Sequence, residues 1–159
     1  HRNQRRKAMK VDVNRPKEGD ALWVVGDRIR FLGGLPGSEL ELIEVEVPDG
    51  SGTPPHSHAS AEMFYIVEGE LTVRQFPGAT EPPVVITAGP GTAVRIASGM
   101  PHNYANESGC TVRMVVLIEP TMIAFFRDIG TAEAQEQPDF ARIGAAMERH
   151  GIDVLNMAA

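Results

Sequence analysis

The stretch His56-Ser-His58-Ala-Ser-Ala-Glu62 constrains this chain more than any other part of its sequence. On an extended strand, residues two apart face the same side, so His56 and His58 can present both imidazoles to one point. Helical metal sites space their histidines four apart, and Pro54-Pro55 disfavours a helix here. Imidazole nitrogens and a carboxylate are ligands for divalent transition metals. The stretch predicts a strand-borne metal site, although an exposed polar loop explains this pattern equally well when it is taken alone.

A second histidine-bearing stretch favours the metal site. It runs from Gly91 to Asn106 and places His102 directly after a Gly-Met-Pro turn, where a strand can begin. The other two histidines have ordinary explanations. His1 belongs to the N-terminal tail, and His150 falls in the last turn of a predicted helix, where it complements the helix dipole. The remaining three of the five histidines therefore converge on one predicted site.

Together the two stretches resemble the paired motifs of the cupin superfamily. The first motif, G-x5-H-x-H-x3-E-x6-G, is filled at every fixed position, by Gly50, His56, His58, Glu62 and Gly69. The second motif, G-x5-P-x-G-x2-H-x3-N, is matched by Gly91, Gly99, His102 and Asn106, with Ala97 in place of the proline. That departure concerns the rigidity of a turn and not a ligand. The resemblance covers about residues 26–119.

The resemblance implies a mainly β protein with a single cupin barrel (a double-stranded β-helix or jelly roll) and C-terminal helices. The barrel would hold one divalent metal ion (Fe, Mn, Ni, Co, Cu or Zn) on His56, His58, Glu62 and His102. These ligands do not select one metal, because affinity follows the general divalent series and cellular supply. The resemblance also implies a homodimer, in which the N-terminal segment adds a strand to the partner.

The remaining patterns predict one domain in three segments. Residues 1–17 form a basic tail, residues 18–120 form the barrel, and residues 121–159 form a helical extension that packs on the barrel. Short apolar runs separated by glycine and proline turns are typical of a barrel or sandwich. Between Leu42 and Ile43 the alternation changes phase, which predicts a β-bulge or a sharp bend.

The apolar spacing after residue 120 predicts two helices. The first is expected to be capped by Thr121 and to end at Gly130; the second is expected to start near Asp139 and to stop at Gly151. Their apolar stripes are interpreted as surfaces that pack on the barrel and not as part of a ligand site. The stripes comprise Met122, Phe125, Phe126 and Ile129, then Phe140, Ile143 and Met147.

Composition narrows the classes of partner. The net charge is −6, the chain has one cysteine, and no apolar run is long enough for a membrane span. We expect a soluble, cytoplasmic protein in which Cys110 is structural or incidental. The body of the chain is acidic, which disfavours nucleic acid and leaves a small-molecule substrate as the expected partner.

The first functional hypothesis is a metal-dependent dioxygenase that acts on a small aromatic or enol-type substrate. The segment Ile123–Gly130 after the last strand resembles small bacterial cupins of the quercetin dioxygenase-like group. That resemblance implies that Glu62 detaches and acts as a general base. Tyr104, two residues past His102, can face the site and donate a hydrogen bond, or can be a wall residue without chemistry. The expected apolar pocket walls are Phe64, Ile66, Val94, Ile96, Met114 and Val116.

Two other classes of function stay open. One is a non-oxidative lyase, isomerase or hydrolase in which the metal acts as a Lewis acid. The other is a non-catalytic cupin that binds a small ligand, with a structural metal. An anaerobic assay separates the dioxygenase from the first alternative, because only the dioxygenase requires oxygen.

Overall fold

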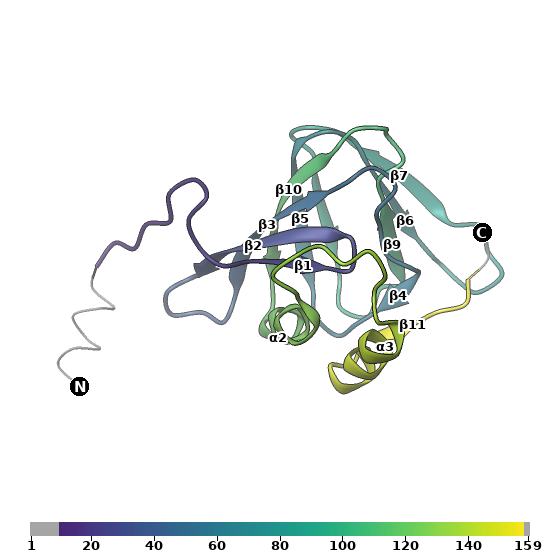
Figure 1. The fold of residues 1–159 in the computed structure, drawn as a ribbon. Coiled ribbons are helices and arrows are strands. Elements are labelled where there is room, and N and C mark those ends of the chain that lie inside the picture. The colour runs from purple at the N-terminus through teal and green to yellow at the C-terminus, as the bar shows by residue number, and fades with distance from the viewer. Residues whose placement is uncertain (1–9, 158–159) are drawn as a thin grey trace.

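The computed structural model describes residues 10–157 and folds them into two facing β-sheets with two helices at one end (Figure 1). The protein is mainly β, as predicted. The six-stranded sheet has the order β1 (Ala21–Val24), β2 (Asp27–Gly34), β3 (Glu41–Val47), β10 (Val112–Ile118), β5 (Glu62–Glu68) and β8 (Ala93–Ile96). The five-stranded sheet has the order β11 (Asp153–Val154), β4 (His56–Ser57), β9 (His102–Ala105), β6 (Leu71–Gln75) and β7 (Val84–Ala88).

The core lies between the two sheets and follows the alternation of the strands. Every second residue of β10, from Val112 to Ile118, is buried, and the same holds for β3 from Ile43 to Val47. Met114 lies between Val45 and Ile66 of the neighbouring strands. Glu62, Phe64 and Ile66 face inward together, as expected for positions two apart on a strand.

The predicted irregularity near Leu42 and Ile43 is present, but the extra residue lies on the opposite strand. Phe31 pairs with Ile43 and Gly33 pairs with Leu42, so Leu32 of β2 is the inserted residue. Strand β3 keeps its alternation here, so Leu42 faces outward and 39% of it is exposed, while Ile43 is buried. A bulge of this kind bends the strand, which lets the sheet close toward its partner.

The turn between β1 and β2 has an unusual backbone. Val24 pairs with Asp27, so only Val25 and Gly26 connect the strands. Val25 has φ 58°, a left-handed conformation in which a β-branched residue is an outlier. A Cβ atom on Gly26 would lie 2.6 Å from the hydroxyl of Ser51. The turn therefore fixes Asp27 beside Ser51.

The two helices follow the last long strand, with one change from the prediction. Helix α2 spans Pro120–Ile129 and starts after Glu119, so Thr121 lies inside the helix and is not its cap. A proline fits the first helical position because its missing N–H has no partner there in any case. Helix α3 spans Phe140–Arg149, and Asp139 caps it by accepting a hydrogen bond from the backbone N–H of Arg142.

The C-terminal segment is more than a helical extension. After α3 the chain returns to the barrel, where β11 pairs with β4 and sets Val154 opposite His56. A strand of two residues has no sequence pattern that predicts it. Figure 1 shows α2 and α3 at the end of the barrel where β4 and β11 lie.

The basic tail lies only partly within the described residues. Residues 1–9 lie outside them, and residues 10–17 are exposed and contain no strand or helix. Neither helix in residues 10–157 is long and apolar enough to cross a membrane.

Candidate metal centre

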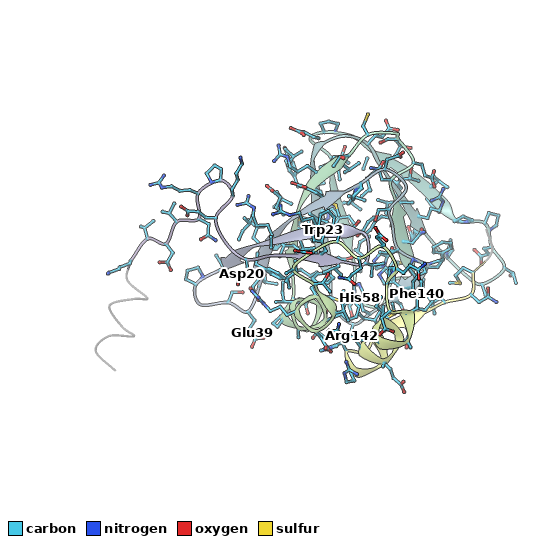
Figure 2. All side chains as sticks on the ribbon, in the orientation of Figure 1. Asp20, Trp23, Glu39, His58, Phe140 and Arg142 are labelled. Atoms are coloured by element: carbon cyan, nitrogen blue, oxygen red, sulfur yellow. The ribbon has the colours of Figure 1, made fainter. Side chains whose placement is uncertain are left out.

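His56, His58 and His102 meet inside the barrel. Their candidate ligand atoms all lie within 4.8 Å of one another, and all three side chains are buried. His56 and His102 are register partners across β4 and β9, and His58 follows one residue after the end of β4. Figure 2 labels His58 in the interior, near the end covered by the helices. The convergence of three histidines predicted from the sequence is confirmed.

Each of these histidines is oriented by a backbone carbonyl. In all three rings Nδ1 lies within hydrogen-bonding distance of a carbonyl oxygen two residues away in the chain. Because a carbonyl only accepts, each Nδ1 carries the proton and each Nε2 keeps its lone pair. The acceptors are Pro54 for His56 at 2.9 Å, Ser60 for His58 at 2.7 Å, and Met100 for His102 at 2.7 Å.

The Nε2 lone pairs lie beside a carboxylate, and this arrangement favours a bound cation. Nε2 of His58 is buried and has no hydrogen-bond partner among residues 10–157. One oxygen of Glu62 lies 3.1 Å from Nε2 of His102 and 3.7 Å from Nε2 of His58. Lone pairs that face a carboxylate repel one another unless a proton or a cation lies between them. The donor set therefore fits a divalent transition metal.

The protonation of His56 agrees with this. Burial, and after it the nearby His102, lower the pKa of His56 to about 4. His56 is therefore neutral near pH 7, which is the form that binds a metal. Glu62 contacts two of the three rings, and its service as a fourth ligand stays a prediction.

A cavity of about 210 Å³ adjoins His56 and His58. Of the six predicted wall residues, Phe64, Met114 and Val116 line it. Ile66, Val94 and Ile96 face inward too, but they belong to the packed core and do not border the cavity. The inward side chains of a barrel stack in layers, and only the layer nearest the open space becomes a wall.

Both helices contribute to the same cavity, so the interpretation that their apolar stripes are not part of a ligand site was wrong. Residues of both stripes belong to the hydrophobic core, and residues of both also line the pocket. Phe140 borders the cavity although 73% of it is exposed, so it lies at the rim. Figure 2 shows Phe140 on α3, at the end of the barrel where His58 lies. The helical lining residues are Met122, Phe125, Phe126, Phe140, Ile143 and Met147.

A second polar group faces the cavity. Tyr104 lines it, as expected, and donates a hydrogen bond from its hydroxyl to the carboxylate of Asp27. Ser51 donates a second hydrogen bond to Asp27, at 2.6 Å. Burial raises the pKa of Asp27, and the bonds from Ser51 and Tyr104 partly offset it. Burial also raises the pKa of Tyr104, helped by Asp27, so the phenol keeps its proton.

No sequence pattern marked Asp27 as a site residue. It directly follows Gly26 at a hairpin turn, where an aspartate is usual and needs no functional explanation. The one local hint was Val25 two positions earlier, because a valine is poorly suited to a tight hairpin turn and indicates that this turn is unusual.

Comparisons with known proteins agree with the fold. Residues 43–118 match the family described as "Cupin domain". No curated protein sequence matches the chain. The polyketide cyclase RemF from Streptomyces resistomycificus has a similar structure, with 28% identity and a TM-score of 0.58. The match covers 70% of this chain and 80% of that protein.

Two further structures are more distant and support the fold alone. An RmlC-like cupin from Shewanella frigidimarina has 16% identity and a TM-score of 0.57, over 70% of this chain and 92% of that one. The hydroxypropylphosphonic acid epoxidase from S. wedmorenis has 20% identity and a TM-score of 0.54, over 67% of this chain and 58% of that one. Together with the family match, these neighbours establish a cupin jelly roll.

Proposed function

We propose that this protein, whose residues 43–118 match the cupin domain family, is a metal-dependent dioxygenase that acts on a small aromatic or enol-type molecule. The observation that carries the proposal is the orientation of the three histidines. Their Nε2 lone pairs meet at the wall of an apolar cavity, beside a carboxylate. This combination provides a metal position and a substrate position in direct contact.

The side chains at the site have different roles in this reaction. His56, His58 and His102 would hold the metal ion, with Glu62 as a fourth ligand. A redox-active metal, when bound, would act as a Lewis acid and exchange electrons with dioxygen. Glu62 lies at the same point and accepts the proton of a substrate hydroxyl, which leaves an electron-rich enolate. The apolar walls exclude water and hold the flat face of the substrate.

A non-oxidative reaction is the second candidate, and two observations favour it. The neighbour with the highest identity among those described above is called a polyketide cyclase. The Asp27–Tyr104 pair also places a second carboxylate, which can accept a proton without any need for oxygen, in the cavity. In this reaction the metal polarises a carbonyl, and the side chains of the cavity transfer the protons of a ring closure or isomerisation.

One experiment separates these functions. The protein is purified without added metal, its metal content is measured, and oxygen uptake is followed with a panel of flavonols, enols and naphthols. We expect nearly one redox-active metal ion per chain and oxygen uptake that stops in the His58→Ala variant. His150→Ala is the matched control, because His150 lies outside the site.

The other outcomes are equally informative. Substrate loss under anaerobic conditions would support the cyclase or isomerase. Metal-dependent stabilisation without turnover of any compound would support the non-catalytic binding protein. Failure to bind any divalent metal, even after reconstitution, would overturn the proposal.

A further inference from the structure

We propose that Asp27 and Tyr104 form a specificity site that selects an uncharged ligand bearing a hydroxyl group. The proposal rests on the function proposed above, because it assumes that the cavity receives a small flat substrate. It adds a second recognition point, separate from the histidines. This point disfavours anionic ligands and ligands without a hydroxyl group.

The pair is built from both sheets. Asp27 is the first residue of β2 in the six-stranded sheet, and Tyr104 lies on β9 in the five-stranded sheet. Their hydrogen bond therefore joins the two sheets, and both residues line the cavity. Ser51, from the loop before β4, donates the second hydrogen bond to Asp27.

The hydrogen-bonding capacity of the pair is only partly used. An ionised carboxylate offers about four acceptor positions, and here Tyr104 and Ser51 occupy two of them. The hydroxyl proton of Tyr104 is donated to Asp27. Toward a ligand, the tyrosine oxygen can therefore act only as a hydrogen-bond acceptor. Both groups therefore require a donor from the ligand. A phenol or enol supplies one, and an ether or a hydrocarbon does not.

The charges around the cavity exclude anions. Among the described residues that line the cavity, Asp27 and Glu62 are acidic, and none is a lysine or an arginine. A carboxylate or phosphate on the ligand would lose its hydration without gaining a positive partner near Asp27. The Asp27 end of the cavity therefore accepts a hydroxyl that carries no charge.

The shape of the cavity points to an aromatic ring. Phe64 packs edge-on against Tyr104, with ring centroids 5.9 Å apart and an angle of 87° between the rings. The volume of about 210 Å³ exceeds the roughly 150 Å³ of an apolar protein cavity that holds benzene. One or two fused rings fit this space, next to the hydroxyl-binding pair.

The strained turn provides independent support. Val25 adopts φ 58° immediately before Gly26 and Asp27, and it lines the cavity itself. Strain of this kind persists where the surrounding structure holds a residue in place, and it concentrates at ligand sites. Here the strained residue lies two positions before Asp27, whose carboxylate accepts hydrogen bonds from Ser51 and Tyr104.

The test is equilibrium binding of three related probes to the protein. The probes are 2-naphthol, its ether 2-methoxynaphthalene and its anionic relative 2-naphthoate. Binding is measured by calorimetry with zinc-loaded protein and again after EDTA treatment. We expect 2-naphthol to bind about tenfold more tightly than the ether, because a hydrogen bond to a charged group is at stake. The preference should persist without metal, and 2-naphthoate should bind most weakly to the metal-free protein.

Two variants test whether Asp27 and Tyr104 cause the preference for 2-naphthol over its ether. Tyr104→Phe and Asp27→Ala should reduce the preference for 2-naphthol to less than about threefold and leave the ether binding unchanged. Tyr65→Phe and Asp12→Asn are matched controls, because both residues are exposed. If Asp27→Ala does not fold, as judged by circular dichroism, Asp27→Asn replaces it.

The outcomes keep this inference separate from the proposed function. Equal affinity of the wild-type protein for 2-naphthol and its ether would overturn the inference, as would a preference that survives in both variants. Absence of binding of all three probes would overturn it too. Metal content and oxygen uptake, measured on the same preparations, test the proposed function independently of these results.

Discussion

His56 and His102 are register partners across β4 and β9, with ring centroids 4.4 Å apart. Each ring is held by a hydrogen bond from Nδ1 to the carbonyl two residues earlier in the chain. Strand pairing thus sets the separation of the two rings, and local loops set their direction. The site is therefore organised by the protein itself before any ligand binds, and the predictions below depend on that organisation.

We predict that His58→Ala loses most bound metal while the barrel stays folded. Nε2 of His58 has no partner within the described protein, so its removal deletes a ligand without breaking a hydrogen bond at that atom. Metal analysis and circular dichroism of the purified variant check this, with His150→Ala as the control. Full metal content in His58→Ala would rule out this ligand set.

We predict that Glu62→Gln retains part of the metal but loses turnover. Glutamine has the same shape and can still contact Nε2 of His102, but it cannot accept a proton from a substrate. General base catalysis contributes about 10²- to 10⁴-fold, so turnover should fall by at least about 100-fold. The control is Glu70→Gln, at an exposed position. Unchanged turnover in Glu62→Gln would remove this residue as the base.

We predict that the metal-free protein loses stability as the pH falls from about 6.5 to about 4. The pKa of His56 is about 4 in the fold and near the ordinary value of 6.5 in the unfolded chain, so the unfolded chain binds the proton more readily. The loss should be on the order of 3 kcal/mol, since each unit of pKa corresponds to about 1.4 kcal/mol. Urea denaturation at a series of pH values measures it.

The variant His56→Gln tests the assignment of that pH dependence. It should show a flatter pH profile than the wild type over the same interval. An identical slope in wild type and His56→Gln would show that other groups cause the acid destabilisation.

We predict that Asp27→Asn is more stable than the wild type in neutral and mildly alkaline buffer. Burial raises the pKa of Asp27, so its folded form favours the proton, and this contribution is lost as the pH rises through the raised pKa. Asparagine carries no charge to desolvate. The advantage should shrink as the pH approaches the ordinary aspartate value of about 3.9. Thermal melting at several pH values checks this, and an advantage that grows toward acid would contradict it.

We predict that Val25→Gly raises the melting temperature. A β-branched residue at φ 58° carries strain of about 1–3 kcal/mol, and the added chain entropy of glycine offsets about 0.5–1 kcal/mol of the relief. The net gain should be about 1 kcal/mol, which corresponds to roughly 2–4 °C in a domain of this size. Val25→Ala is the matched control, since alanine keeps a Cβ and should recover less. A lower melting temperature for Val25→Gly than for the wild type would contradict the strain.

Several predictions from the sequence stay untested by the fold. They are the quercetin dioxygenase-like grouping, the homodimer, the cytoplasmic location and the choice of metal. Size-exclusion chromatography with light scattering would test the homodimer directly.

The sequence alone determined which faces of the long strands are buried and which three histidines converge. Alternation in β3, β5 and β10 is a local pattern, and burial of one face follows from it. The two histidine motifs have fixed internal spacings, so the approach of His56, His58 and His102 could be predicted before the structure was known.

Tertiary structure alone decided the rest of the site. Asp27 and Tyr104 are 77 positions apart, and neither has a neighbour that indicates the other. An apolar helical stripe has the same pattern whether it faces a packed core or a cavity, so the lining by Phe125 and Met147 was not visible. Strand β11 is too short to have a period. The physical reason is common to all three: sequence patterns record which face of an element is buried, and only the packing of distant elements decides what that face meets.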